Sequence, residues 1–197
     1  MPGPGQAQLY WHMLMRDQPQ VCALAALARQ RLDGFPGPDF APGQWLHLSV
    51  LRLGLDSDIP SGAVDVLVRE TRQRLQAVAP ATVTLGRVLY HPEAITLGVG
   101  PDRALDPVAA AIREAARSTP GIPGDSPYGP WIPHVTVAYS TQEQVAGPII
   151  AALGRELPSC QVTIGSVSLV AQHGPERAWA WEPFAHLPLG TAPGGSG

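Results

Sequence analysis

The sequence predicts an α+β fold, bilobal and duplicated, in which two antiparallel sheets with flanking helices are arranged about a pseudo-two-fold axis with a central open groove. Short segments rich in Leu and Val alternate with segments whose apolar residues recur at helical spacing. Two short pieces of sequence also occur twice, in the same order. The 21 Gly and 22 Pro residues cluster between the periodic segments, as loop residues do. A length of 197 residues fits one domain, or two small lobes that share a core.

The first half of the chain is predicted to fold as a strand, a helix, a second strand, a second helix and a hairpin. Asp17 and Gln20 have the spacing of a capping box for the first helix, which Gly34 ends. His91-Pro92-Glu93 is expected to be the turn of the hairpin. The strands are predicted at Leu9–Arg16, Gln44–Gly54, Thr82–Tyr90 and Ala94–Val99, and the helices at residues 17–34 and 64–78.

The second half of the chain repeats much of this order. Asp106 is a predicted N-cap, and Pro107 suits the first helical position of a helix that runs to about Ser118. Thr141 and Gln144 have the spacing of a capping box for a further helix. The predicted strands are His134–Ser140 and then a closing pair, Gln161–Val170 with Ala178–Leu187. A Gly/Pro-rich loop, 120–133, precedes the first of them, and the tail 190–197 is expected to be disordered.

Two local matches indicate that one unit is written twice. His47-Leu48-Ser49-Val50 is matched by His134-Val135-Thr136-Val137, 87 positions later, and 83–88 (VTLGRV) is matched by 162–167 (VTIGSV), 79 positions later. Both matches occur in the same order and in the same structural context. We therefore expect a single domain over residues 1–189, built from two intertwined lobes with repeat units at about 17–100 and 104–187.

Composition and charge exclude several classes of function. The formal net charge is −3, so the chain suits one phosphate or one nucleic-acid end better than a long duplex. All 13 basic residues are Arg, which excludes chemistry through a nucleophilic lysine in this chain. Cys22 and Cys160 are too few for a disulfide framework, and no residues have metal-ligand spacing. Without a leader segment or an apolar run of about 18 residues, we expect a soluble, cytoplasmic monomer with no membrane contact and no obligate protein partner.

The paired motif carries groups suited to phosphodiester hydrolysis. In a strand, residues i and i+2 lie on the same side, so His47 shares a face with Ser49, and His134 with Thr136. One imidazole can deprotonate water while the other protonates the leaving oxygen, because the imidazole pKa lies near neutrality. The two hydroxyls can donate hydrogen bonds to the phosphate oxygens. This chemistry requires neither a metal nor a cofactor, and the residues alone leave the acid and base roles interchangeable.

Two His-x-Ser/Thr motifs at this spacing in a duplicated α+β chain resemble the 2H phosphoesterase superfamily, in particular its bacterial 2′-5′ RNA ligase-like branch. The segments 167–170 and 179–183 (VSLV and WAWEP) are also similar to that branch. The resemblance implies hydrolysis of 2′,3′-cyclic phosphate ends of RNA or of small cyclic nucleotides, with weak 2′-5′ joining at most. It implies that His47 is the general acid and His134 the general base, with Ser49 and Thr136 binding the phosphate.

The sequence departs from many members of the branch at Arg52, where an aromatic residue is usual. Strand alternation predicts that Arg52 faces away from His47 and that Tyr139 faces away from Thr136, so that both affect packing more than catalysis.

Four further residues are candidates for substrate contact. Trp45, Trp131 and Tyr128 can stack on a base, and His12 can line the groove from the first strand. The alternative for the aromatic residues is core or loop packing. Two other functions stay open: a phosphoesterase acting on a small metabolite, and a protein that binds an RNA end or a nucleotide without turning it over.

Overall fold

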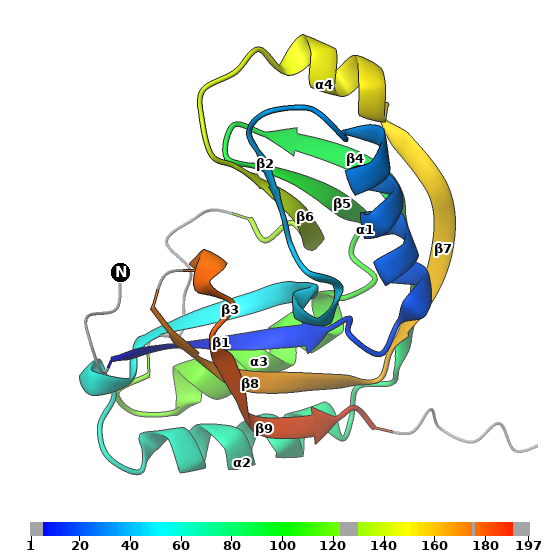
Figure 1. Cartoon of the computed structure of the whole chain (residues 1–197). Helices are drawn as coiled ribbons and strands as arrows, with labels where there is room; N and C mark the ends of the chain where they lie inside the picture. Colours follow the sequence, from blue (N-terminus) through cyan, green and yellow to red (C-terminus); the bar gives the residue numbers. More distant parts are fainter. Residues whose placement is uncertain (1–5, 123–129, 175, 191–197) are drawn as a thin grey trace, which may run out of the picture.

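The computed structural model describes residues 6–122, 130–174 and 176–190, and it has the predicted α+β architecture with two antiparallel sheets (Figure 1). In the four-stranded sheet the order is β3-β1-β8-β9, and in the five-stranded sheet it is β2-β6-β5-β4-β7. The strands of the first sheet are β3 His47–Leu55, β1 Ala7–Leu14, β8 Ser166–His173 and β9 Trp181–Pro188. Those of the second are β2 Pro38–Phe40, β6 His134–Ser140, β5 Ala94–Gly100, β4 Ala81–His91 and β7 Glu156–Ile164.

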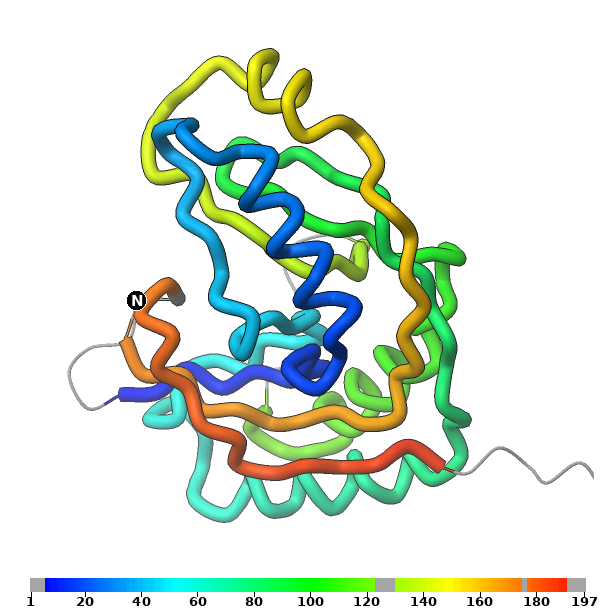
Figure 2. The backbone as a smooth tube through the Cα atoms, turned by 45° about the vertical axis from the view of Figure 1, so that its right-hand side comes forward, coloured from blue at the N-terminus to red at the C-terminus, as the bar shows by residue number. Residues whose placement is uncertain are grey.

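Two α-helices accompany each sheet. Helices α2 (Ala63–Leu75) and α3 (Asp106–Ser118) pack together against the four-stranded sheet, through contacts of α2 with β9 and of α3 with β3. Helices α1 (Pro19–Arg31) and α4 (Ala146–Leu153) contact each other and lie beside the five-stranded sheet, with α1 against β7 (Figures 1 and 2). Short 3₁₀ helices occur at Gly43–Trp45 (η1), Asp56–Asp58 (η2) and Glu176–Ala178 (η3). Helix α1 follows β1 of the four-stranded sheet and packs on β7 of the five-stranded sheet.

A single hydrophobic cluster holds both lobes together. It includes the apolar residues that alternate with the motif side chains, which are Leu48, Val50, Val135 and Val137. Each is nearly or fully buried, which is worth roughly 1.5–3 kcal/mol for a side chain of this size. This burial points the intervening His, Ser and Thr side chains to the other side of their strands.

The predicted strand Gln161–Val170 is wrong as a single element, because the chain changes sheets at Gly165. Residues before Gly165 form β7, which pairs with β4, and residues after it form β8, which pairs with β1 and β9. The apolar residues lie at even positions before Gly165 (Val162 and Ile164) and at odd positions after it (Val167 and Leu169). This change in the phase of the alternation is the mark of the crossover in the sequence. Residues 44–46, predicted as strand, belong mainly to the 3₁₀ helix before β3.

Both predicted capping boxes are also wrong. Helix α1 begins at Pro19 with Gln18 as its N-cap, and α4 begins at Ala146 with Val145 as its N-cap. Neither N-cap residue makes a side-chain capping hydrogen bond. Thr141 instead donates from its Oγ1 to the carbonyl of Gly37, at 2.9 Å. The N-cap of α3 is Leu105, one residue before the predicted Asp106, so Pro107 is the second helical residue and not the first as predicted.

The register of β4 and β7 is symmetric about the internal sequence match. Val83 is paired with Val162, its own counterpart 79 positions later, while Thr82 is paired with Thr163 and Thr84 with Gln161. The hydroxyls of Thr82 and Thr163 lie 3.1 Å apart. Positions equally distant from Val83 and Val162 therefore face each other, which is the arrangement that a local two-fold axis between these two residues produces.

Gly190, the first residue of the tail that was predicted to be disordered, is held by backbone hydrogen bonds. The amide of Gly190 donates to the carbonyls of Leu75 and Val78 at the end of α2, each at 2.9 Å. Residues 191–197 lie outside the described part of the chain.

Candidate active site

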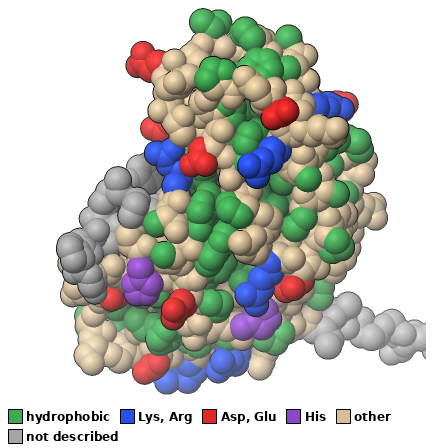
Figure 3. Space-filling model, in the orientation of Figure 1, with side chains coloured by type: hydrophobic (Ala, Val, Ile, Leu, Met, Phe, Trp, Pro, Cys, Tyr) green, Lys and Arg blue, Asp and Glu red, His purple; other side chains and the backbone are tan. Residues whose placement is uncertain are grey.

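The two motif strands come from different sheets and approach each other. Strand β3 is at the edge of the four-stranded sheet, β6 is next to the edge of the other sheet, and the two strands are in contact. The indole N–H of Trp131, just before β6, donates to the carbonyl of Ser49 in β3 at 2.9 Å. Figure 3 shows hydrophobic side chains in a band between the two lobes on one face of the molecule, with charged side chains above and below it.

Each motif strand contains a β-bulge at the same place. In β3 the pairing with β1 passes from Ser49 to Leu51, and in β6 the pairing with β5 passes from Thr136 to Ala138. The skipped residues are Val50 and Val137, which are 87 positions apart like the motifs themselves. A bulge shifts the alternation of all later side chains by one residue. The duplication thus includes the irregularities of the strands as well as their sequence.

These bulges overturn the predicted orientation of Arg52 and Tyr139. Arg52 is paired with Tyr10, and Ser49 is paired with His12, two residues further along β1. Arg52 therefore shares the face of Ser49, and its guanidinium donates to Gln8 at 2.8 Å. By the same register Tyr139 shares the face of Thr136, and both line one cavity. A prediction from uninterrupted alternation missed this, although the apolar residues of β3 lie at 48 and 50 and then at 51 and 53, which marks a change of phase at the bulge.

The two motif histidines are oriented by identical hydrogen bonds. Nδ1 of His47 lies 2.7 Å from the carbonyl of Trp45, and Nδ1 of His134 lies 2.8 Å from the carbonyl of Ile132. A carbonyl only accepts, so Nδ1 carries the proton in both rings. In each neutral ring the lone pair is then on Nε2, which accepts a proton as a base and donates it as an acid.

His47 lies among aromatic rings. The ring of His12 is 4.1 Å from it, centroid to centroid, and Trp181 is 5.9 Å away with its ring edge-on. Trp181 also contacts Trp45, at 4.7 Å. Trp45 therefore reaches the surroundings of His47 from η1, although the strand expected to carry it begins only at His47.

His12 is buried beneath this cluster and is 1% exposed. Neither of its ring nitrogens has a hydrogen-bond partner among the described residues. Burial, and then the positive charge that His47 can carry, lower the pKa of His12 well below its usual value of 6.5. His12 is therefore a neutral ring at physiological pH and cannot itself be the general acid.

His134 lies in more open surroundings. Together with Thr136 it lines a cavity of ≈ 650 Å³ on the open face of the five-stranded sheet, which also includes Tyr139 and Arg177. Arg177 comes from η3, and its guanidinium lies 3.6 Å from the carboxylate of Asp39. Arg177 is a cation beside the second motif that the sequence analysis missed, because no spacing links η3 to β6.

Of the two remaining residues predicted to contact substrate, Trp131 and Tyr128, only Trp131 lies in the described part of the chain. Trp131 makes the bond to Ser49, and the guanidinium of Arg113 lies over its ring at 5.4 Å. Its indole N–H thus joins the two lobes, whereas the predicted stacking on a base stays a prediction. Tyr128 lies outside the described residues.

The described residues form neither a metal centre nor a disulfide. No three His, Cys, Asp or Glu side chains within residues 6–122, 130–174 and 176–190 are grouped so that they could hold a metal ion. Cys22 and Cys160 are free thiols. No helix in these segments is long and apolar enough to cross a membrane.

Comparisons with solved structures show the same fold over almost the whole chain. TT0787 of Thermus thermophilus superposes with a TM-score of 0.72 at 18% identity, covering 93% of this chain and 98% of that one. Escherichia coli LigT complexed with 3′-AMP gives 0.69 at 18% identity, with coverage of 94% and 99%. The MHV ns2 PDE domain gives 0.63 at 16% identity, with coverage of 83% and 99%.

A search of curated protein sequences finds no match. A search against protein-family profiles matches residues 18–176, which include both His-x-Ser/Thr motifs, to the 2′-5′ RNA ligase superfamily. Since this match covers most of the chain and the fold agrees with it, the protein belongs to the 2′-5′ RNA ligase superfamily of 2H phosphoesterases.

Proposed function

We propose that this protein is a metal-independent cyclic phosphodiesterase that hydrolyses 2′,3′-cyclic phosphate ends of RNA, or small cyclic nucleotides, by two-histidine acid–base catalysis. The observation that carries the proposal is the matched pair of Nδ1 hydrogen bonds, which leave Nε2 of both His47 and His134 as the proton-exchanging atom. Nucleotide binding in the family supports it, since a solved structure of Escherichia coli LigT is complexed with 3′-AMP.

In the proposed reaction, Nε2 of His134 accepts a proton from water as the water oxygen bonds to phosphorus. Nε2 of protonated His47 donates its proton to the ribose oxygen as the bond from that oxygen to phosphorus breaks. The product is a phosphomonoester with a free neighbouring hydroxyl. One proton is taken up and one is released, so the balance closes with two imidazoles alone. The assignment of acid and base follows the family pattern.

The hydroxyls of Ser49 and Thr136 donate to the non-bridging phosphate oxygens, where negative charge increases in the transition state. Arg177 adds a cation on the side of Thr136. The positive charges around the site are few, which suits a single phosphate group.

The test is hydrolysis of the four nucleoside 2′,3′-cyclic monophosphates, and of a short RNA with this end, in EDTA between pH 5 and 9. Phosphorus NMR identifies which oxygen leaves. We expect a bell-shaped rate profile that survives chelation, and a loss of about 10²-fold or more in His47→Ala and in His134→Ala.

His173→Ala is the matched control, because His173 is an exposed residue at the end of β8. Full activity in both motif variants would refute the site, and rescue by added metal would refute the mechanism. Nucleotide binding without turnover by the unmodified protein would favour a binding protein instead.

A further inference from the structure

A second cavity opens on the same sheet face as His134, toward the opposite end of the strands from the cavity that His134 lines with Arg177. Its volume is ≈ 440 Å³, and it lies over β4, β5 and β7. Gly98 in its floor is the direct pairing partner of His134 across β5 and β6. Paired residues in an antiparallel sheet share a face and are neighbours, so the cavity begins beside the candidate base.

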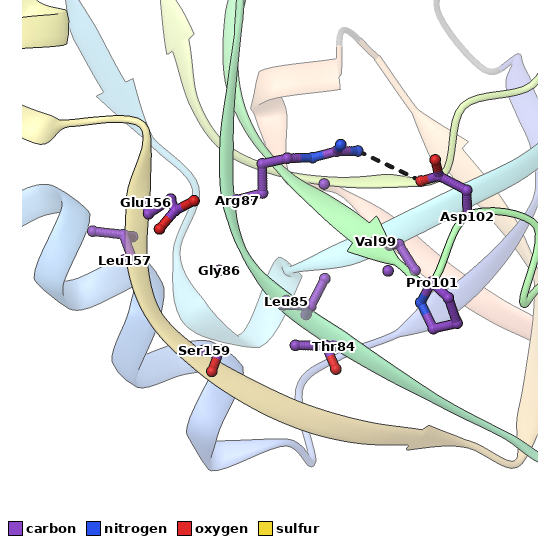
Figure 4. Close-up of a pocket in the computed structure, with 12 residues that line it drawn as sticks. Thr84, Leu85, Gly86, Arg87, Val99, Pro101, Asp102, Glu156, Leu157 and Ser159 are labelled. Carbon is purple, nitrogen blue, oxygen red and sulfur yellow. Dashed lines mark ion pairs between the residues drawn. The ribbon is translucent and has the colours of Figure 1, made fainter.

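The side chain of Arg87 forms one wall of this cavity (Figure 4). It extends from β4 across the sheet, and a Cβ atom placed on Gly98 would lie only 3.1 Å from its Nε. Glycine at position 98 therefore provides the space in which the guanidinium lies. Arg87 reaches Asp102 at 3.8 Å, but the side chains are 56% and 83% exposed, so this ion pair is weak.

The repeat supplies an internal reference for this arrangement. Leu14 is paired with His47 in the first lobe, as Gly98 is paired with His134 in the second. The sequence match places Ser166 at the position that corresponds to Arg87. The four-stranded sheet therefore has Leu14 and Ser166 at the positions that Gly98 and Arg87 occupy in the five-stranded sheet. The combination of glycine and arginine is found only beside His134 and is not needed to form the sheet.

The charges in this cavity favour a neutral ligand over a second phosphate. One guanidinium is accompanied by the carboxylates of Asp102 and Glu156, and Ser159 adds a hydroxyl. The three glycines Gly86, Gly98 and Gly100 leave the floor without side chains. A flat ring with hydrogen-bond acceptors on one edge and donors on another matches such a site. Guanine has this pattern, with O6 and N7 as acceptors for Arg and N–H groups for a carboxylate.

We propose that this cavity is a nucleobase subsite selective for guanine, with Arg87 and Asp102 as its specificity-determining residues. The subsite rests on the proposed function, because it holds the base of the nucleotide whose cyclic phosphate is bound at His134 and Thr136. The cyclic phosphate would then lie in the other cavity, which His134, Thr136 and Arg177 line.

The experiment compares kcat/KM for guanosine and adenosine 2′,3′-cyclic phosphates in the unmodified protein and in Arg87→Gln, Asp102→Asn and Gly98→Ala. We expect a preference for guanosine of about tenfold or more. Each variant should reduce this preference to within about threefold, because kcat/KM falls much more for guanosine than for adenosine. In Gly98→Ala the added methyl group displaces the guanidinium without removing it.

The matched control is Arg117→Gln on α3, an exposed arginine with an ion pair to Glu114, which should keep the preference. Calorimetric binding of guanosine 2′-phosphate and adenosine 2′-phosphate to the same proteins gives a readout that does not need turnover.

Equal turnover of both substrates, or a preference that survives in the three variants, would overturn the subsite and leave the phosphodiesterase intact. No turnover of either substrate, with guanine-selective binding that Arg87→Gln abolishes, would support the subsite and overturn the phosphodiesterase. Absence of selective binding as well as turnover would overturn both.

Discussion

His12 is an unusual residue to find beneath a candidate acid–base group. Its ring is in contact with His47, and it is buried with two nitrogens that have no partner among the described residues. An unsatisfied buried polar atom costs about 1–3 kcal/mol, so a phenyl ring would be the more stable choice for packing alone. His12 was predicted to line the groove from the first strand, and in the folded chain the ring of Trp181, which lies far along the sequence, is 5.9 Å from its ring.

His12→Phe should change how stability depends on pH. The pKa of His12 in the folded protein lies below 6.5, the value expected when unfolded. Between these two values the unfolded chain binds a proton that the folded protein does not, so stability is present above pH 6.5 and falls as the pH decreases. The slope from this residue approaches about 1.4 kcal/mol per pH unit. His12→Phe should remove this component, measured by urea unfolding at pH 7, 6 and 5.

His173→Phe serves as the comparison, because this exposed histidine should leave the acid dependence unchanged. If the free energy of unfolding of His12→Phe depends on pH in the same way as that of the unmodified protein, then His12 can be protonated in the folded state, and the conclusion that its ring is neutral is wrong.

The strands show how far sequence patterns determine the elements. The limits of β6 were predicted without error, and those of β4 and β5 to within one residue, because alternation and the turn at 91–93 mark them clearly. The bulges at Val50 and Val137 were not predicted, and neither was the change of sheets at Gly165. The alternation changes phase at Val50-Leu51 and again across Gly165-Ser166, but the strands that pair with these segments are distant in the chain, so the local pattern does not identify them.

The same limit applies to the candidate site. The four motif residues were found from the duplication, because spacing within one strand carries the information. Arg87, Arg177 and Trp181 were missed as site residues, because they come from other strands and loops and meet the motifs only in the folded chain.

Among the glycines inside the described helices and strands, Gly86 is the one where an added Cβ atom would come closest to another atom. A Cβ atom there would lie 3.0 Å from Cα of Ser159 and 3.2 Å from the carbonyl of Leu157, which are backbone atoms of β7. Gly86→Ala should therefore lower the free energy of unfolding by about 1–3 kcal/mol, measured by urea denaturation.

The control is the counterpart of Gly86 in the second repeat, Gly165, where an added Cβ would meet nothing within 4 Å. Gly165→Ala should change stability by no more than about 0.5 kcal/mol. Equal effects at the two glycines would mean that the close approach of β4 and β7 does not restrain Gly86.

In the whole molecule, the strands of the two repeats are related by the pseudo-two-fold axis, but the residues around the two motif histidines differ. The matching bulges and the symmetric pairing of Val83 with Val162 preserve the two-fold relation. The half-buried His47 contacts His12 and Trp181, whereas the exposed His134 is flanked by two cavities. Unequal surroundings suit a reaction with one acid and one base, because they allow the two histidines to take different roles.

The bond from Trp131 to Ser49 connects these two unequal halves. Trp131 directly precedes Ile132, whose carbonyl orients His134, so the bond fixes both ends of the site. Trp131→Phe should lower kcat about fivefold, in line with the loss of one hydrogen bond, and leave KM unchanged. Arg113→Gln, which removes the cation over the ring but keeps the N–H, should retain full kcat. A raised KM with normal kcat in Trp131→Phe would instead assign the indole to substrate contact.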